Sequence, residues 1–141
     1  MAHLINPDWT KINISGKFAD FSLNIVEEDY SKELKINFDV DDDNYSICFD
    51  MTQNCCEDFG YNTTDNIEIT KTDPNKFTKL TIGHTSEFDG HDNYKNEMHV
   101  KFKLSTDDNE YKIIFYNNHN GYYSHYFILK KNNISIFQTS L

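Results

Sequence analysis

The residues of this chain that are best suited to chemistry form two short groups, about 60 residues apart. Cys55, Cys56 and Glu57 are consecutive and follow an apolar segment. His119 and His125 enclose the sequence Asn-Gly-Tyr-Tyr-Ser. A thiolate beside an imidazole is an activated nucleophile. The two groups would therefore supply a Cys–His pair if the fold brought them together.

The spacing of the cysteines argues against a zinc site. Paired zinc ligands usually stand roughly two to four residues apart, whereas Cys55 and Cys56 are adjacent and Cys48 is the only other cysteine. Adjacent side chains of an extended segment point to opposite faces, so one of the two reaches a given site. An odd number of cysteines and no secretory signal indicate free thiols in a reducing compartment. We expect no metal and no disulfide, and the two adjacent cysteines are either small buried side chains or reactive or ligand-contacting thiols.

The second group has the sequence of a tight hairpin. Asn120-Gly121 tolerates positive φ and is a strong signal for a two-residue turn. Tyr122 and Tyr123 would then point to opposite faces, either as an aromatic brace or with one ring on a ligand or partner surface. The candidate binding residues of the two groups are Cys55, Cys56, Glu57, His119, Asn120, Tyr122, Tyr123 and His125.

Acidic clusters in this chain are better explained as turns than as cation sites. Residues 41–43 and 107–108 are Asp runs between apolar segments, a composition typical of turns. Residues 89–93 lack the alternating oxygen ligands and the closing Glu of a calcium loop. Two longer polar stretches, residues 52–64 and 85–97, are expected to be connections, and long connections often carry binding groups.

The elements that must position these groups are strands. Apolar and polar residues alternate with a period of two through residues 34–40 and 98–104, which predicts half-buried strands. The side chains expected inside are Ile36, Phe38, Val100 and Phe102, and those expected outside are Lys35, Asn37, Lys101 and Lys103. Weaker alternation predicts strands at residues 12–18, 21–26, 45–51, 66–71, 77–84, 111–117, 122–129 and 133–137. No long window shows the helical period of about 3.6 residues.

These elements predict a single all-β domain covering residues 1–141. Nine or ten short strands joined by tight turns are typical of an antiparallel sandwich or a barrel-like roll. The alternative is an α+β fold with one short helix. A chain of 141 residues with 38% hydrophobic and 15% aromatic residues suffices for one core.

The charge of the chain excludes several classes of partner. The formal net charge is −10, with 13 lysines, no arginine and 23 acidic residues. Nucleic acids and anionic membranes bind through clustered basic residues, so we expect neither as a partner. No apolar run is long enough to span a bilayer, and the start of the sequence has no basic or apolar leader. We therefore expect a soluble cytoplasmic protein.

Two segments of the chain together resemble a family of small uncharacterised viral domains. The first is residues 55–60, Cys-Cys-Glu-Asp-Phe-Gly, and the second is residues 116–125, which contain Asn-Gly-Tyr-Tyr-Ser. The family is found in bacteriophages and in giant DNA viruses of protists, and the Asn-, Ile- and Lys-rich composition agrees with such a source. The resemblance covers about residues 45–130 and leaves residues 1–44 as N-terminal strands beyond it. It implies no activity and no cofactor, but it implies that the two motifs belong together.

We expect from these observations a non-enzymatic binding or host-interaction module of a virus, located in the host cytoplasm or the virion. Its partner would be a protein or a small-molecule ligand. The alternatives are a Cys/His-dependent hydrolase or transferase and a structural virion component. We also expect the Cys-Cys-Glu segment and the Asn-Gly-Tyr-Tyr turn to lie side by side, with Cys56 near Tyr123, through pairing or packing of the strands at residues 45–51 and 122–129.

Overall fold

The computed structural model describes residues 3–4, 12–52, 59–63, 77–88, 94–104, 110–118 and 124–141. These parts of the chain form strands and contain no helix. The strands are β1 (His3–Leu4), β2 (Ile12–Ser15), β3 (Phe18–Glu28), β4 (Ser31–Val40), β5 (Asp43–Asp50), β6 (Phe59–Thr63), β7 (Phe77–Phe88), β8 (Tyr94–Leu104), β9 (Glu110–Asn117), β10 (Tyr126–Lys131) and β11 (Ile134–Ser140). It follows that no helix in the described ranges is long and apolar enough to cross a membrane.

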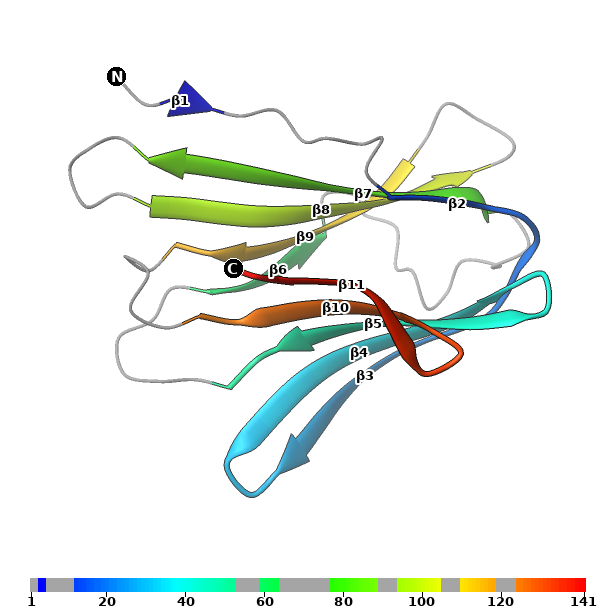
Figure 1. Cartoon of the computed structure of the whole chain (residues 1–141), viewed down its shortest axis with the longest axis horizontal. Helices are drawn as coiled ribbons and strands as arrows, with labels where there is room; N and C mark the ends of the chain where they lie inside the picture. Colours follow the sequence, from blue (N-terminus) through cyan, green and yellow to red (C-terminus); the bar gives the residue numbers. More distant parts are fainter. Residues whose placement is uncertain are drawn as a thin grey trace.

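The strands form two antiparallel sheets that pack face to face. Sheet A has the order β1-β7-β8-β9-β6, with β2 also paired to β7, and sheet B has the order β11-β10-β5-β4-β3. Figure 1 shows sheet A in the upper half of the molecule and sheet B in the lower half. The described strands do not close into a barrel. The expected all-β antiparallel sandwich is therefore confirmed.

The alternation of side chains along the two regular strands places the core between the sheets. Ile36 and Phe38 of β4 and Val100 and Phe102 of β8 are fully buried, as expected. The rings of Phe38 and Phe102 meet edge to face across the two sheets, with centroids 5.7 Å apart. The polar residues between them lie on the outer faces, where Lys103 is exposed and Lys35, Asn37 and Lys101 are half-buried.

The strand predicted at residues 12–18 is divided in the structure. The chain leaves sheet A at Ser15, turns at Gly16 and Lys17, and enters sheet B at Phe18. Gly16 has a φ of +153°, and a Cβ there would lie 2.7 Å from Val40 Cγ1. Lys17 donates its N–H to Asp41 Oδ1 at 3.1 Å, and Asp41 donates its N–H to the Lys17 carbonyl at 2.9 Å. Glycine is needed because the corner combines an unusual φ with a close approach of two chain segments.

Two predicted connections are partly strand. Within residues 52–64, β6 pairs with β9, and this short strand is too polar to show a clear period. Within residues 85–97, β7 and β8 continue their pairing from Thr85↔Glu97 to Phe88↔Tyr94, so the loop between them is shorter than predicted. Main-chain hydrogen bonds to a neighbouring strand outweigh a polar sequence in both places. The strand predicted at residues 66–71 lies outside the described residues.

Candidate functional site

The two candidate groups belong to connections that carry the chain between the sheets. Residues 51–58 lead from β5 in sheet B to β6 in sheet A, and residues 118–125 lead from β9 in sheet A to β10 in sheet B. The structure describes His125 among the candidate residues. The others lie outside the described ranges: Cys55, Cys56, Glu57, His119, Asn120, Tyr122 and Tyr123.

The described ends of these two connections meet at one end of the sandwich. β5 and β10 are neighbours in sheet B, with Phe49 opposite Phe127. β6 and β9 are neighbours in sheet A, with Phe59 opposite Asn117. Of the two arrangements expected for the strands at residues 45–51 and 122–129, the structure thus shows pairing. The expected contact between Cys56 and Tyr123 lies outside the described residues. We call this part of the molecule, formed by residues 50–52, 59, 117–118 and 124–125, the crossing end.

His125 lies at the centre of the crossing end and joins its parts. Its side chain is fully buried, and its ring stacks on Phe59 with centroids 4.0 Å apart. Its Nδ1 lies 2.8 Å from the backbone oxygen of Asp50. Because a carbonyl oxygen can only accept, Nδ1 carries the proton and donates it to Asp50. One imidazole therefore connects the end of β5 to the start of β6.

The last residue of the chain closes the crossing end on the other side. His125 and Leu141 exchange two backbone hydrogen bonds, of 3.0 and 2.8 Å. The buried Asn117 side chain donates its amide N–H to the Leu141 carbonyl at 2.9 Å. Buried polar groups are costly unless they are hydrogen-bonded. These bonds allow an imidazole and an amide to lie within an otherwise aromatic core.

The tip of the β3–β4 hairpin holds the end of β5 from the opposite side. Met51 donates its N–H to the Lys32 carbonyl at 2.7 Å, and Lys32 donates its N–H to Thr52 Oγ1 at 3.1 Å. Thr52 in turn donates its own N–H to Asp50 Oδ1 at 3.0 Å. The segment that contains the adjacent cysteines therefore starts from a point fixed on both sides.

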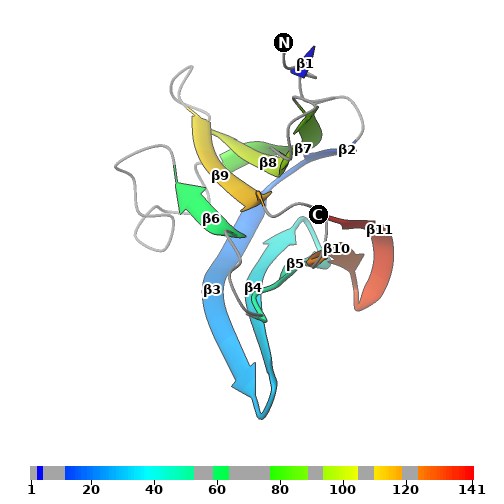
Figure 2. The same ribbon diagram turned by 90° about the vertical axis from the view of Figure 1, so that its left-hand side faces the viewer.

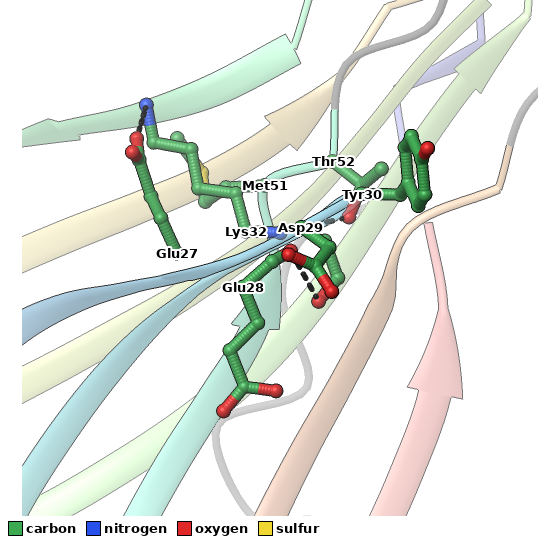
Figure 3. Close-up of a pocket in the computed structure, with 8 residues that line it drawn as sticks. Glu27, Glu28, Asp29, Tyr30, Lys32, Met51 and Thr52 are labelled. Carbon is green, nitrogen blue, oxygen red and sulfur yellow. Dashed lines mark hydrogen bonds and ion pairs between the residues drawn. The ribbon is translucent and has the colours of Figure 1, made fainter.

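A hollow of about 480 Å³ opens between the hairpin tip and the end of β5. Figure 3 places the Glu27–Lys32 ion pair, 3.4 Å long, on one side of the hollow and the Tyr30 ring on the other. Its lining is Glu27, Glu28, Asp29, Tyr30, Ser31, Lys32, Met51 and Thr52. No residue of this hollow is among the candidates predicted from the sequence, although the acidic run between two predicted strands is a signal for an exposed turn.

The described cysteine is not an activated nucleophile. Cys48 lies on the outer face of sheet B but is only 1% exposed, and it is a free thiol. Burial raises the pKa of the Cys48 thiol, and the nearby Glu33 carboxylate raises this pKa further. Burial also raises the pKa of the neighbouring Tyr126, whose hydroxyl donates to Glu33 Oε2 at 2.5 Å. At neutral pH both groups stay protonated, and a protonated thiol is a poor nucleophile.

The geometry of the crossing end positions two connections and orients one imidazole. The Nδ1 proton of His125 is committed to Asp50, and its ring is buried against Phe59. Within the described ranges, no group of three or more His, Cys, Asp or Glu side chains could hold a metal ion. The described residues thus hold the starting points of both connections and fix the Nδ1–H tautomer of His125.

Comparison with known proteins gives a family for this chain. No curated protein and no solved structure matches the chain. One family model matches residues 7–129, a wider range than the segment of about residues 45–130 over which the resemblance was drawn. The match extends from before β2 into β10 and includes both candidate connections. The chain belongs to the family described as a domain of unknown function, DUF7448.

Proposed function

We propose that this protein is a non-enzymatic binding module, a viral accessory protein that acts in the host cytoplasm. Its partner, a host protein or a small ligand, would contact the connections at residues 53–58 and 119–123. One observation carries the proposal: both connections leave and return at the crossing end, around the buried His125. Loops held by a rigid β-sandwich are a common way to build a binding surface.

The hollow beside the crossing end indicates the chemistry of the partner. Its volume of about 480 Å³ falls within the range of ligand sites, roughly 300–1,000 Å³. Three carboxylates line it, and one lysine is paired with the first of them. A negative, polar surface next to Met51 and Thr52 favours a partner that carries positive charge or many hydrogen-bond donors.

The described residues give less support to a Cys–His enzyme. Such an enzyme would need a histidine that accepts the thiol proton. The His125 ring donates through Nδ1 to Asp50, so its Nε2 is the acceptor nitrogen. The ring is fully buried and stacked on Phe59, which restricts access to it. The enzymatic alternative would pair Cys55 or Cys56 with His119 or with the buried His125. A cysteine whose alkylation slows markedly in His119→Ala would support that alternative over the binding module.

A quantitative affinity capture tests the proposal. The tagged full chain and the variant Cys55→Ser/Cys56→Ser/Glu57→Gln are incubated with extract of a protist host, and bound proteins and small molecules are measured by mass spectrometry. The control is Lys17→Gln/Asp42→Asn, which alters exposed residues at the opposite end of the sandwich.

We expect one specific partner to be recovered by the wild type and the control, and about tenfold less by the variant, the loss expected when a hot-spot group is removed. Binding is then repeated by calorimetry with the purified partner. Equal recovery by all three proteins, at equal thermal stability, would overturn the proposal.

A further inference from the structure

Four of the lysines gather on the outer face of sheet A. Lys79 comes from β7, Lys101 and Lys103 come from β8, and Lys112 comes from β9. We call these four residues the lysine face. In the strand register, Lys79 lies directly opposite Lys103, and Lys101 lies directly opposite Lys112.

The lysine face is not explained by folding. Like charges placed directly opposite each other weaken a sheet, and this chain has 23 acidic residues but only 13 lysines. Lys103 also lies opposite Glu110 on its other side, and Lys101 pairs with the same carboxylate. A carboxylate at Lys79 or Lys112, however, would have given a favourable cross-strand pair. Two like-charge pairs on one face indicate that a positive surface itself is useful to the protein.

The lysine face retains most of its charge. Glu110 pairs with Lys101 at 3.0 Å, so these five residues together have a net charge of +3. None of the ion pairs between described residues involves Lys79, Lys103 or Lys112. The face is therefore a positive region on a protein whose overall charge is −10.

A shallow hollow in the lysine face limits what can bind there. Its volume is about 230 Å³, and it is lined by Lys79, Thr81, Lys101, Lys103 and Glu110. This is below the range of about 300–1,000 Å³ that is usual for small-molecule sites. The hollow is suited to a protruding side chain of a partner, held between lysine stems whose methylene groups are apolar.

The tip of the β3–β4 hairpin has the complementary properties. Glu27, Glu28 and Asp29 are exposed there and carry three negative charges, against one lysine paired with Glu27. Tyr30 at the turn is 95% exposed. Exposed tyrosines often become the anchor of a protein interface. The tip thus combines negative charge with one large side chain that is not packed against the domain.

One copy of the protein cannot bring these two regions together. Figures 1 and 2 both place β7 and β8 at the top of the molecule and the tip of the β3–β4 hairpin at the bottom. A contact between the regions therefore requires two copies. Because each copy has one tip and one lysine face, the contact would be heterologous and could repeat from copy to copy.

We propose that the hairpin tip of one copy docks on the lysine face of a second copy, with Tyr30 in the hollow. The chain would then associate head to tail. The inference goes beyond the proposed function because the lysine face has no part in that function. The hairpin tip is shared, since its acidic side chains also line the hollow beside the crossing end. A nucleic acid fits this face less well, because the chain has no arginine and its overall negative charge repels a long polyanion.

The proposed contact is small and largely electrostatic. A hairpin tip on a sheet face buries less than about 1,200 Å², the size of weak, transient interfaces. Exposed charges interact over about 10 Å in 0.1 M salt but only about 3 Å in 1 M salt. Association should therefore depend on protein concentration and disappear at high salt.

Two variants remove one side of the contact each. Lys79→Gln/Lys112→Gln takes one lysine from each like-charge pair, so it should not weaken sheet A. Glu27→Gln/Glu28→Gln removes charge from the exposed tip. The matched controls are Lys130→Gln in β10 of sheet B and Asp42→Asn in the turn between β4 and β5, which change charges away from both regions.

Sedimentation velocity of the full chain at low salt and at about 1 M salt tests the contact. We expect the mass of the wild type and of both controls to rise with concentration at low salt and to return to the monomer at high salt. Each double variant should stay monomeric. An equimolar mixture of the two should form one-to-one dimers and nothing larger, because only one tip and one lysine face in each pair are intact.

Three results would overturn the inference. The first is that the wild type stays monomeric at low salt up to the highest soluble concentration. The second is that both double variants still associate. The third is that the equimolar mixture of the two double variants stays monomeric. Heparin binding that is lost in Lys79→Gln/Lys112→Gln, with a monomeric wild type, would assign the face to a polyanion instead. Partner capture through Cys55, Cys56 and Glu57 is measured separately, so either proposal can fail alone.

Discussion

The two ends of the sandwich connect the sheets in different ways. At one end the chain crosses once, through the two-residue corner of Gly16 and Lys17, above a group of packed rings. We call this the corner end, and its rings are Phe18, Phe38, Tyr45, Phe77 and Phe102. At the crossing end the chain crosses twice, and a histidine and an asparagine are buried among the aromatic side chains.

The difference shows how one core can serve two purposes. Apolar packing at the corner end has no preferred partner atoms, so it stabilises the domain without fixing a unique arrangement of polar groups. Hydrogen bonds from His125 and Asn117 at the crossing end are directional and lose free energy when displaced. They therefore hold the starting points of the two connections in one geometry.

The largest expected effect is at the corner end. Phe38→Ala or Phe102→Ala should lower the free energy of unfolding by about 3–5 kcal/mol, because each leaves a cavity in a fully buried ring cluster. Chemical denaturation measures the loss. The control, Tyr30→Ala at the exposed hairpin tip, should change stability by less than about 0.5 kcal/mol. An equally small loss at Phe38 would mean that the ring cluster does not carry the stability of this end.

The next effect separates packing from hydrogen bonding at the crossing end. His125→Ala should cost about 3 kcal/mol, since it opens a cavity and leaves the Asp50 carbonyl without its donor. His125→Phe restores much of the volume but not the bond, and should cost about 1–2 kcal/mol. The same denaturation assay measures both. Full stability of His125→Phe would show that the crossing end is held by packing alone, like the corner end.

Glycine substitutions compare the two ends directly. Gly16→Ala should cost about 1–3 kcal/mol, because its new Cβ would meet Val40 Cγ1 at 2.7 Å in a strained backbone conformation. Gly60→Ala, in β6, has similar backbone strain, but its Cβ would meet the Tyr116 hydroxyl at 3.2 Å. That hydroxyl is the far end of a side chain and can move. Thermal denaturation should show the larger loss for Gly16→Ala, and the reverse order would contradict the account of the corner.

The smallest effect concerns alkaline pH. The raised pKa values of Cys48 and Tyr126 mean that the folded protein keeps these protons when the unfolded chain has lost them. Stability should therefore be complete below the ordinary cysteine pKa of 9.0 and fall as pH rises above it.

Each group can contribute at most about 1.4 kcal/mol per pH unit to this fall. Unfolding in urea at a series of pH values, with reductant present, measures it. Cys48→Ala should lose less stability between neutral and alkaline pH than the wild type. Identical pH profiles of the two proteins would show that the buried thiol has no part in the fall.

The features predicted from the sequence are those that depend on neighbouring residues. The alternation in β4 and β8 identified Phe38 and Phe102 as buried, because adjacent side chains of a strand must point to opposite faces. The contact between β5 and β10 was also expected, from the two motifs that flank these strands. Strand β6 was missed because its pairing with β9, not its own pattern, makes it a strand.

The roles of individual polar residues depended on contacts between distant parts of the chain. His125 was a candidate for binding or catalysis, but its place in the core follows from Asp50 and Leu141, which lie in other elements. The lysine face depends in the same way on strand register, which sets Lys79 against Lys103. The alternation excludes a slip of one residue, which would turn a whole strand over. A slip of two residues would keep the same faces but separate Lys79 from Lys103, and no local pattern excludes it.

The strand order of sheet B has a consequence for synthesis on the ribosome. Strand β5, in which residues 45–49 are all buried, pairs with β10, whose first residue lies 76 positions after Asp50. At 5–20 residues per second, translation takes about 4–15 s to supply that partner. Throughout this time the nascent chain presents β5 as an open, apolar edge, the kind of surface that chaperones protect. Slower decoding of this interval would lengthen the exposure, so synonymous codons can alter the yield of a protein whose amino-acid sequence is unchanged.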